Sequence, residues 1–477
     1  MQEKQVDVAI IGSGTAGLNA RSVVDKAGGS WALIESGAYG TTCARVGCMP
    51  SKLLIAAADA AHEIHAAGLF GVYVDDVRID GEQVLDRVRR ERDRFAGFVV
   101  KDTQALPAEH RLSGEARFVG PTTLEVGDHT RVTANAVVIA AGSDPFIPPP
   151  FDAIRKHVIT NDDVFELERL PKSLAVVGTG IIGLELGQAM ARLGLHVVFF
   201  ARSTDLGPLT DPDVKAAVFA QMDSELNLRL STSIIDAART DQGVQIQWRD
   251  AEDAEHEEIF DTVLVAAGRR PNIPDLNLAA TGLELNSRGM PPWDPSTAQC
   301  GDLPIFLAGD ASAHIPLLHE AADEGRIAGE NAMQYPDIVA HARRTPLAVV
   351  FTDPQIAMAG QRYADLNTND TEIGAVSFDD QGRARVMGRN RGLLRIYARR
   401  RCGTLLGAEM FGPRMEHIAH LLAWAIQQKL TVQQALEMPF YHPVVEEGLR
   451  TALRDLAYKL KVADSLRCED MAEAPGC

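Results

Sequence analysis

An apolar run followed by a glycine-rich turn and a helix-compatible stretch occurs twice along the chain. Residues 6–11 read VDVAII and residues 174–177 read LAVV, and each run leads directly into the pattern G-x-G-x-x-G. The glycines of the two copies are Gly12, Gly14 and Gly17, and Gly178, Gly180 and Gly183. This spacing permits a tight turn, close approach of the backbone to a pyrophosphate and close helix packing. One copy is weak evidence, but two copies in this context predict two dinucleotide-binding units.

The next strand of each unit indicates which nucleotide it accepts. Residues 31–34 end in Glu35, which lies 23 residues after Gly12 and suits a ribose without a 2′-phosphate. The same count from Gly178 reaches Ala201, and Arg202 follows. A cation at this position accommodates a 2′-phosphate, which favours NADP, although a solvated arginine after a strand has the same appearance.

The remaining pattern completes a mixed α/β architecture. Paired strands end at Gly142 and Gly268, an apolar strand ends at Asp310, and a helix is expected over 317–331. From about residue 346 short alternating strands such as 393–397 accompany a helix near 415–428. We therefore predict two Rossmann-like domains for FAD and NAD(P) and a C-terminal α+β dimerisation domain. The expected boundaries are 1–155 for the first nucleotide-binding domain, 156–275 for the second, 276–345 for a central segment packing on the first, and 346–477 for the C-terminal domain.

Length, charge and cysteine content narrow the class of protein. At about 150 residues per domain, 477 residues predict about three domains. The formal net charge of −18 works against binding to nucleic acid or to anionic membranes. The first residues lack the basic region and cleavage site of a signal peptide, and we find no apolar run near the roughly 18 residues of a membrane span. We expect a cytoplasmic protein, with no nucleic acid and no membrane as partner.

Two of the six cysteines, Cys43 and Cys48, lie close together in the sequence. Ideal helix geometry separates residues i and i+5 by about 8.6 Å between Cα atoms, which exceeds the limit of about 7 Å for a disulfide. A bridge needs a local distortion, which Gly47 permits, and a strained bond is easily reduced. A redox-active disulfide is favoured, with metal binding and inert thiols as the alternatives. No second Cys/His pair follows at a usable spacing, so we predict no metal site.

The stretches GTTCARVGCMPSK at 40–52 and FYHPVVEE at 440–447, with both glycine motifs and the strand ending at Asp310, resemble the pyridine nucleotide-disulfide oxidoreductases. The resemblance covers nearly the whole chain and is strongest to the dihydrolipoamide dehydrogenases, with glutathione and mercuric reductases as relatives. It implies FAD in the first unit, with Glu35 on the ribose and Asp310 near the ribityl chain and pyrophosphate. It implies NAD or NADP in the second unit.

The resemblance also implies roles for the reactive side chains. Cys43 matches the thiol that exchanges with substrate, and Cys48 the thiol beside the flavin. Lys52 and Glu185 match an ion pair at the flavin. His442 and Glu447 match an acid–base dyad that serves the active site of the other subunit, so a homodimer with shared active sites is expected.

The expected activity is FAD-dependent oxidation of protein-bound dihydrolipoamide by NAD(P)⁺, with a lipoyl-domain protein or a small dithiol as the partner. An alternative is an NADPH-dependent reductase of a small disulfide or metal ion, similar to glutathione or mercuric reductase. A third interpretation is a non-catalytic redox-sensing subunit. Arg45 between the cysteines either lowers the pKa of the exchange thiol or is simply solvated. Cys468 and Cys477 are expected to be idle thiols rather than an electron relay.

Overall fold

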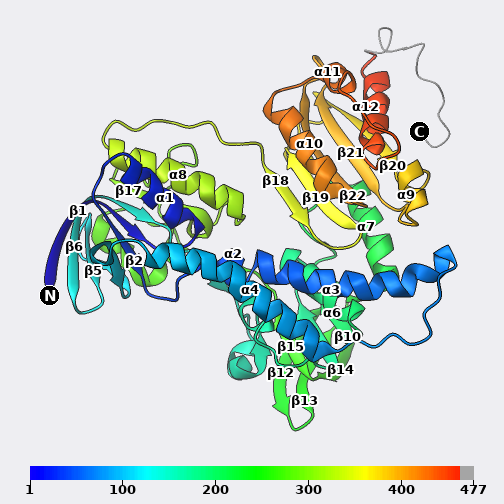
Figure 1. Cartoon of the computed structure of the whole chain (residues 1–477), viewed down its shortest axis with the longest axis horizontal. Helices are drawn as coiled ribbons and strands as arrows, with labels where there is room; N and C mark the ends of the chain where they lie inside the picture. Colours follow the sequence, from blue (N-terminus) through cyan, green and yellow to red (C-terminus); the bar gives the residue numbers. More distant parts are fainter. Residues whose placement is uncertain (462–477) are drawn as a thin grey trace.

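The chain forms a mixed α/β structure built on three larger β-sheets (Figure 1). The structure is a computed structural model, and it describes residues 1–461. The predicted helices near 317–331 and 415–428 are confirmed as α8 (Leu318–Gln334) and α10 (Met415–Gln427). The fold class predicted from the sequence is therefore correct.

The first sheet has the strand order β3-β2-β1-β6-β5-β4, and β17 pairs with β6. Its strands are β1 (Gln2–Ile11), β2 (Trp31–Glu35), β3 (Arg111–Ser113), β4 (Ala116–Phe118), β5 (Thr123–Val126), β6 (Thr130–Ile139) and β17 (Ile305–Leu307). The strands β1, β2, β3, β6 and β17 are parallel, whereas β5 runs antiparallel to both of its neighbours, β4 and β6. Because β17 joins β6, part of the 276–345 segment lies on the first sheet.

Small residues let α1 (Thr15–Lys26) and α8 pack closely beside this sheet. A side chain at Gly325 would meet the backbone of Ala16 at 2.2 Å, and one at Gly329 would meet the backbone of Ala20 at 2.8 Å. Larger residues at these positions would separate the helices, so glycine is required by packing.

Two long helices, α3 (Cys48–Ala66) and α4 (Gly81–Gln104), follow the first two strands. The short helix α2 (Thr42–Arg45) precedes α3, and the short helix η1 (Ala67–Phe70) follows it. By length and composition alone, the helical segment 42–70 would suffice to cross a membrane, contrary to the expectation that no apolar run approaches that length. The core helix of a soluble protein passes the same test, and α3 packs here against α4 and α6 (Ile181–Arg192).

The second sheet is fully parallel, with the order β11-β10-β9-β15-β8. Its strands are β8 (Val158–Ile159), β9 (Ser173–Val177), β10 (His196–Phe200), β11 (Asn227–Arg229) and β15 (Thr262–Val265). The helices of this region are α5 (Asn161–Val164), α6 and α7 (Pro212–Glu225), and its antiparallel sheet contains β12 (Ser233–Thr240), β13 (Gly243–Arg249) and β14 (Glu255–Phe260). Two short antiparallel strands, β7 (Ser143–Pro145) and β16 (Arg269–Pro271), pair at the crossover between the two nucleotide units.

The third sheet is antiparallel, with the order β18-β19-β22-β21-β20, and helices pack on it (Figure 1). Its strands are β18 (Leu347–Val350), β19 (Gln355–Gly360), β20 (Thr371–Ser377), β21 (Leu393–Arg399) and β22 (Leu405–Gly412). The further helices are α9 (Gly382–Val386), α11 (Val432–Leu436) and α12 (Glu447–Lys459). The short 3₁₀ helices elsewhere are η2 (Ala108–His110), η3 (Phe151–His157), η4 (Pro274–Leu276), η5 (Leu278–Thr281), η6 (Gly309–Ser312) and η7 (Tyr363–Asp365).

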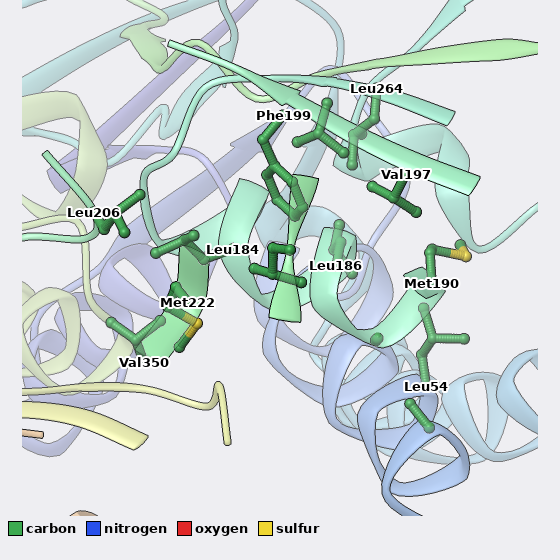
Figure 2. Packing of buried hydrophobic residues seen from close by; sticks show 14 of the residues in the cluster. Leu54, Leu184, Leu186, Met190, Val197, Phe199, Leu206, Met222, Leu264 and Val350 are labelled. Atoms are coloured by element: carbon green, nitrogen blue, oxygen red, sulfur yellow. The ribbon is translucent and has the colours of Figure 1, made fainter. Parts of the chain in front are cut away.

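One buried apolar cluster joins segments that are far apart in the sequence (Figure 2). Leu54 of α3 and Val350 of β18 belong to the same cluster as Leu184, Met190 and Phe199 of the second nucleotide unit. Burial of side chains of this size stabilises the fold by roughly 1.5–3 kcal/mol each. The cluster therefore fixes α3, which begins at Cys48, against α6.

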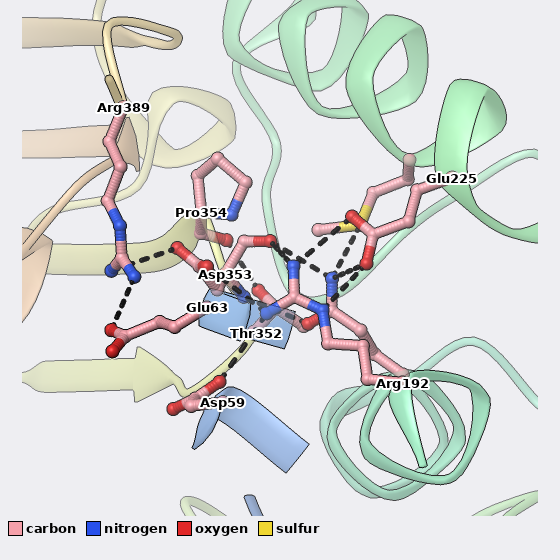
Figure 3. A network of polar contacts seen from close by, with 10 residues as sticks. Asp59, Glu63, Arg192, Glu225, Thr352, Asp353, Pro354 and Arg389 are labelled. Carbon is pink, nitrogen blue, oxygen red and sulfur yellow. Dashed lines mark hydrogen bonds and ion pairs between the residues drawn. The ribbon is translucent and has the colours of Figure 1, made fainter. Parts of the chain in front are cut away.

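Ion pairs reinforce the same junction (Figure 3). Arg192, whose side chain is 6% exposed, pairs with Glu225 at 2.8 Å, Asp353 at 3.1 Å and Asp59 at 3.4 Å. The network links α6, α7, α3 and the loop after β18. The bounds of the four predicted segments, 1–155, 156–275, 276–345 and 346–477, stay a prediction.

Candidate active site

The two glycine motifs have the same local geometry. Gly12 and Gly178 have φ values of +100° and +113°, which side chains rarely adopt. A Cβ atom at Gly17 would lie 1.9 Å from the carbonyl oxygen of Gly12, and one at Gly183 would lie 2.0 Å from that of Gly178. The turn and the first helical turn thus pack backbone to backbone, as a dinucleotide-binding turn requires.

The middle glycines face open space. Apart from the adjoining residues, a Cβ atom at Gly14 or Gly180 would have no atom of residues 1–461 within 4 Å, and both glycines immediately precede a helix, α1 or α6. A bare backbone before a helix N-terminus is the surface that a pyrophosphate approaches. Both motifs therefore fit dinucleotides.

Glu35 is held beside the first motif. Its Oε2 atom accepts hydrogen bonds from the Ser13 amide at 2.8 Å and from the Ser13 hydroxyl at 2.7 Å, and its Oε1 atom accepts one from the Gly37 amide at 2.8 Å. Carboxylate oxygens have further lone pairs for ribose hydroxyls. The residues present fit the adenosine end of FAD.

The second unit has arginines at the equivalent place. Arg202 is exposed just after β10, and Arg229, which the sequence analysis did not single out, ends the neighbouring strand β11. The two strand ends are joined by a hydrogen bond from the Ala201 amide to the Arg229 carbonyl at 3.0 Å. Among residues 1–461, neither arginine is found in an ion pair with a carboxylate. Two unpaired cations thus occupy the edge where an adenosine ribose is expected.

Cys43 and Cys48 lie on opposite sides of a helix break. Cys43 is in α2 and half-buried, whereas Cys48 is exposed as the first residue of α3. Between them, Val46 and Gly47 are not helical, which supplies the distortion expected from the sequence. The two thiols are hydrogen-bonded, so the break brings together side chains that a regular helix would keep apart.

The pKa values of the two thiols shift in opposite directions. The hydrogen bond from Cys43 and the nearby Lys52 cation lower the pKa of Cys48 to about 7, against burial. The hydrogen bond to Cys48 and burial raise the pKa of Cys43. A thiolate at Cys48 is also favoured by its place at a helix N-terminus. Cys48 is therefore the member of the pair that holds negative charge.

Lys52 and Glu185 form the predicted ion pair across α3 and α6. The Lys52 Nζ atom is 2.6 Å from Oε2 of Glu185 and 4.6 Å from the ring centroid of Phe351. Oε1 of Glu185 accepts a hydrogen bond from the Phe351 amide at 2.9 Å. The carboxylate, only 5% exposed, fixes the cation one helical turn from Cys48.

The Arg45 side chain is bonded to the backbone that precedes the cysteine pair. Its guanidinium donates a hydrogen bond to the Ala38 carbonyl at 3.0 Å, and its side chain packs on Gly40. Lys52 is a cation that lowers the pKa of both thiols.

His442 and Glu447 are brought together at the start of α12. His442 Nδ1 lies 3.1 Å from both carboxylate oxygens of Glu447. The histidine side chain is 56% exposed, whereas the carboxylate is 5% exposed. A buried acid that contacts one ring nitrogen orients the imidazole and leaves the other nitrogen facing outward. Within the described part of the chain, no contact joins His442 to either cysteine, and α12 and α2 lie in different regions of the molecule (Figure 1).

The strand ends meet near the crossover between the nucleotide units. Asp310 accepts a hydrogen bond from the Ser143 hydroxyl at 2.8 Å. Gly142 and Gly268 both have positive φ, and a Cβ atom at either would meet no atom of the described residues within 4 Å beyond those of its neighbours in the sequence. Backbone that is open at these strand ends is consistent with cofactor contacts at both positions.

The other cysteines are separate from this site. Cys300 is buried, which raises its pKa to about 12, and Cys402 is exposed on a turn of the third sheet. The predicted idle thiols Cys468 and Cys477 lie outside the described residues. No group of three or more His, Cys, Asp or Glu side chains in residues 1–461 has an arrangement suited to a metal ion.

Two family models match the chain. Residues 6–325 match the pyridine nucleotide-disulphide oxidoreductases, and residues 347–453 match the dimerisation domain of the same proteins. The chain belongs to the pyridine nucleotide-disulphide oxidoreductase family. It is accordingly a flavin-dependent disulfide oxidoreductase that uses FAD and NAD(P), and its dimerisation domain indicates a homodimer.

Individual relatives carry different names. The chain is 31% identical to a dihydrolipoyl dehydrogenase of Halobacterium salinarum, over 94% of this chain and 95% of that protein. It is 30% identical to a mercuric reductase of Acidithiobacillus ferrooxidans, over 96% of this chain and 84% of that protein. The crystal structure of LpdA from Mycobacterium tuberculosis superimposes with a TM-score of 0.81 at 22% identity, over 95% of this chain and 99% of that one. The last likeness concerns the fold alone.

Proposed function

We propose that this protein is a dihydrolipoyl dehydrogenase, which oxidises dihydrolipoamide on a lipoyl-domain protein, or a related small dithiol, with NAD(P)⁺ as the acceptor. The observation that carries the proposal is the His442–Glu447 pair, because a dithiol must lose a proton before it attacks a disulfide. The dihydrolipoyl dehydrogenases among the relatives support the same activity.

The reaction begins with the Cys43–Cys48 pair as a disulfide. His442 of the partner subunit accepts a proton from one substrate thiol, and the thiolate attacks the Cys43 sulfur. The Cys43–Cys48 bond breaks, a mixed disulfide forms, and Cys48 leaves as a thiolate. The second substrate thiol then attacks the substrate sulfur of the mixed disulfide, the bond from that sulfur to Cys43 breaks, and the proton of the attacking thiol passes to the departing Cys43 sulfur. The substrate departs oxidised, and the cysteine pair has gained two electrons as a thiol at Cys43 and a thiolate at Cys48.

The chain's own groups stabilise the charge at each stage. Cys48 is the better leaving group because its pKa is lowered to about 7. Lys52 remains beside it as a fixed cation held by Glu185. Bound FAD would supply the two-electron chemistry that connects the reduced cysteine pair to NAD(P)⁺. Gly12, Gly14, Gly17, Glu35 and Asp310 would hold FAD, and Gly178, Gly180, Gly183 and Arg202 would hold the nicotinamide nucleotide.

The active site is proposed to be shared between the two subunits. His442 is exposed and makes no contact with the cysteines of its own chain within residues 1–461, while Glu447 beneath it is buried. A C2 dimer formed through the face that carries His442 would place this residue of each subunit against the other subunit. The dimerisation-domain match over 347–453 includes both residues of the dyad.

The second candidate is an NADPH-dependent reductase of a small disulfide or metal ion. The unpaired Arg202 and Arg229 favour it, because a 2′-phosphate requires a cation at the strand edge. A mercuric reductase among the relatives also favours it. We propose a cytoplasmic location for either activity, where thiols are kept reduced.

Steady-state kinetics separates these candidates. Dihydrolipoamide is assayed with NAD⁺ and with NADP⁺, and lipoamide, glutathione disulfide and Hg²⁺ are each assayed with NADH and NADPH. We expect the highest kcat/KM for dihydrolipoamide. A higher kcat/KM with glutathione disulfide or Hg²⁺ would support the reductase, and the absence of turnover with every pair would support a non-catalytic subunit.

A further inference from the structure

A chain of side-chain hydrogen bonds connects Asp310 to the peptide between the two cysteines. The Ser143 hydroxyl donates to Oδ2 of Asp310 at 2.8 Å, and Nε of Arg269 donates to the Ser143 hydroxyl at 2.8 Å. Nη1 of Arg269 donates to Oδ1 of Asn161 at 3.1 Å. Nδ2 of Asn161 then donates to the Val46 carbonyl at 3.0 Å. The chain ends within the break between α2 and α3.

Val46 lies in the short segment that connects Cys43 to Cys48. Val46 is the C-cap residue of α2, and its peptide leads to Gly47, which precedes Cys48 at the start of α3. A carbonyl at a helix end has no partner within the helix and needs one from elsewhere. Asn161 supplies that partner from α5, so a side chain of the second nucleotide unit sets the position of this carbonyl.

Asn161 satisfies both ends of its amide at once. It is 6% exposed, and Ser143 is 8% exposed, so the hydrogen bonds are shielded from water. Nδ2 also donates to Oδ1 of the neighbouring Asp162 at 2.7 Å, and Oδ1 accepts from Arg269. A carboxylate of the same shape would keep the acceptor for Arg269 but would lose the donor to Val46.

We propose that Asn161 is a positioning residue that holds the Val46–Gly47 peptide, and with it Cys43 and Cys48, in register with the cofactor-binding Asp310. The inference rests on the proposed roles of the cysteine pair and of Asp310. Ser143 and Arg269 lie on β7 and β16, the paired strands at the crossover, so they form a rigid connection. Small displacements of a reacting group cost roughly 10²-fold in rate, so this connection matters for electron transfer.

The test compares three variants of the FAD-loaded enzyme. Asn161→Asp removes the donor to Val46 at constant shape, and Asn161→Ala removes the whole side chain. Asn272→Ala is the matched control, because Asn272 donates to the Ala141 carbonyl at 3.2 Å near the same crossover and has no bond to the cysteine loop. The readouts are the long-wavelength charge-transfer absorbance between thiolate and flavin after two-electron reduction, its pH midpoint, and kcat.

We expect both Asn161 variants to bind FAD, to lose at least about half of the charge-transfer absorbance, and to lose roughly 10- to 100-fold in kcat. Asn272→Ala should keep the wild-type band. A wild-type band in Asn161→Asp overturns the inference even if Asn161→Ala is impaired or fails to fold, because the Val46 donor would then be dispensable. Failure of the proposed cysteine–flavin chemistry is distinguishable, since the wild-type enzyme itself would then show no such band, and the choice between dithiol oxidation and disulfide reduction is settled separately by the steady-state kinetics.

Discussion

Lys52 Nζ lies 2.6 Å from Oε2 of Glu185, so the cation beside the cysteine pair is fixed by a carboxylate from another helix. Lys52 lowers the pKa of Cys48, whereas Glu185 raises it. Because the ion pair is almost buried on its acidic side, the two charges act on the thiol at short range with little screening. The net balance sets how much Cys48 is thiolate near neutral pH.

Removing one charge of this pair at a time should shift the Cys48 titration in opposite directions. Lys52→Met removes a stabilising cation, so the pKa of Cys48 rises above its value of about 7 and less thiolate is present at pH 7. Glu185→Gln removes an opposing anion, so the pKa falls and thiolate persists to lower pH. The measurement is the pH dependence of iodoacetamide alkylation of Cys48 in the reduced enzyme, followed by peptide mass spectrometry.

Arg45→Met is the matched control for these substitutions. Its guanidinium is bonded to the Ala38 carbonyl, whereas Lys52 is among the main causes of the lowered pKa of Cys48, so the titration midpoint should change much less than in Lys52→Met. Equal shifts in all three variants, or shifts of the same sign for Lys52→Met and Glu185→Gln, would contradict this electrostatic balance.

Cys48→Ser should abolish dithiol oxidation, because a serine hydroxyl cannot form the disulfide. FAD should stay bound, because residue 48 is not part of the glycine motif that binds the nucleotide. Activity with dihydrolipoamide and the flavin absorbance of the purified protein are measured together. Cys402→Ser, which changes an exposed thiol on a turn of the third sheet, should retain wild-type activity. Full turnover of Cys48→Ser would eliminate the proposed disulfide.

His442→Gln should lower kcat by roughly 10²–10⁴, the usual contribution of a positioned acid–base group. Glu447→Gln should have a smaller effect, since the imidazole remains but loses the carboxylate that orients it. His256→Gln serves as the control, because His256 is an exposed histidine on β14 that pairs with Asp250. An unchanged kcat in His442→Gln would remove this residue from the mechanism.

Arg202→Ala and Arg229→Ala should each weaken the use of NADP⁺ more than that of NAD⁺, because only NADP⁺ carries the 2′-phosphate. A pair of steady-state Michaelis constants for each variant makes the comparison. Arg249→Ala removes an arginine that is already paired with Glu255, and both constants should then stay at wild-type values. Equal changes in the Michaelis constants for NAD⁺ and NADP⁺ would show that neither arginine binds the 2′-phosphate.

Periodicity and local motifs were sufficient to predict the nucleotide units, because the turn that G-x-G-x-x-G forms after a strand depends only on residues that are close together in the sequence. The helices over 318–334 and 415–427 were predictable for the same reason. The pairing of Lys52 with Glu185 was predicted only through the family resemblance, since no local pattern brings α3 to α6. The pairing of His442 with Glu447 was likewise predicted from the resemblance of this stretch to the family. Position 45 shows the limit of this approach, because Arg45 lies only two residues after Cys43 in the sequence and yet its guanidinium is bonded to the Ala38 carbonyl.

The hydrogen-bonded path through Ser143, Arg269 and Asn161 had no signal in the sequence. Its members come from β7, β16 and α5, and they meet only because the second nucleotide unit folds back across the crossover. Arg229 was missed for a similar reason, since its closeness to Arg202 arises from the pairing of β10 with β11. Tertiary pairing, rather than composition or spacing, creates these parts of the candidate site.

Mixing Cys48→Ser and His442→Gln chains after subunit exchange tests the central claim most directly. If one active site combines the cysteine pair of one subunit with the histidine of the other, each heterodimer regains one intact site. A statistical mixture should then recover about one quarter of the wild-type dithiol oxidation rate. If heterodimers are verified by mass and the rate stays at the level of the separate variants, the shared cysteine–histidine site is contradicted.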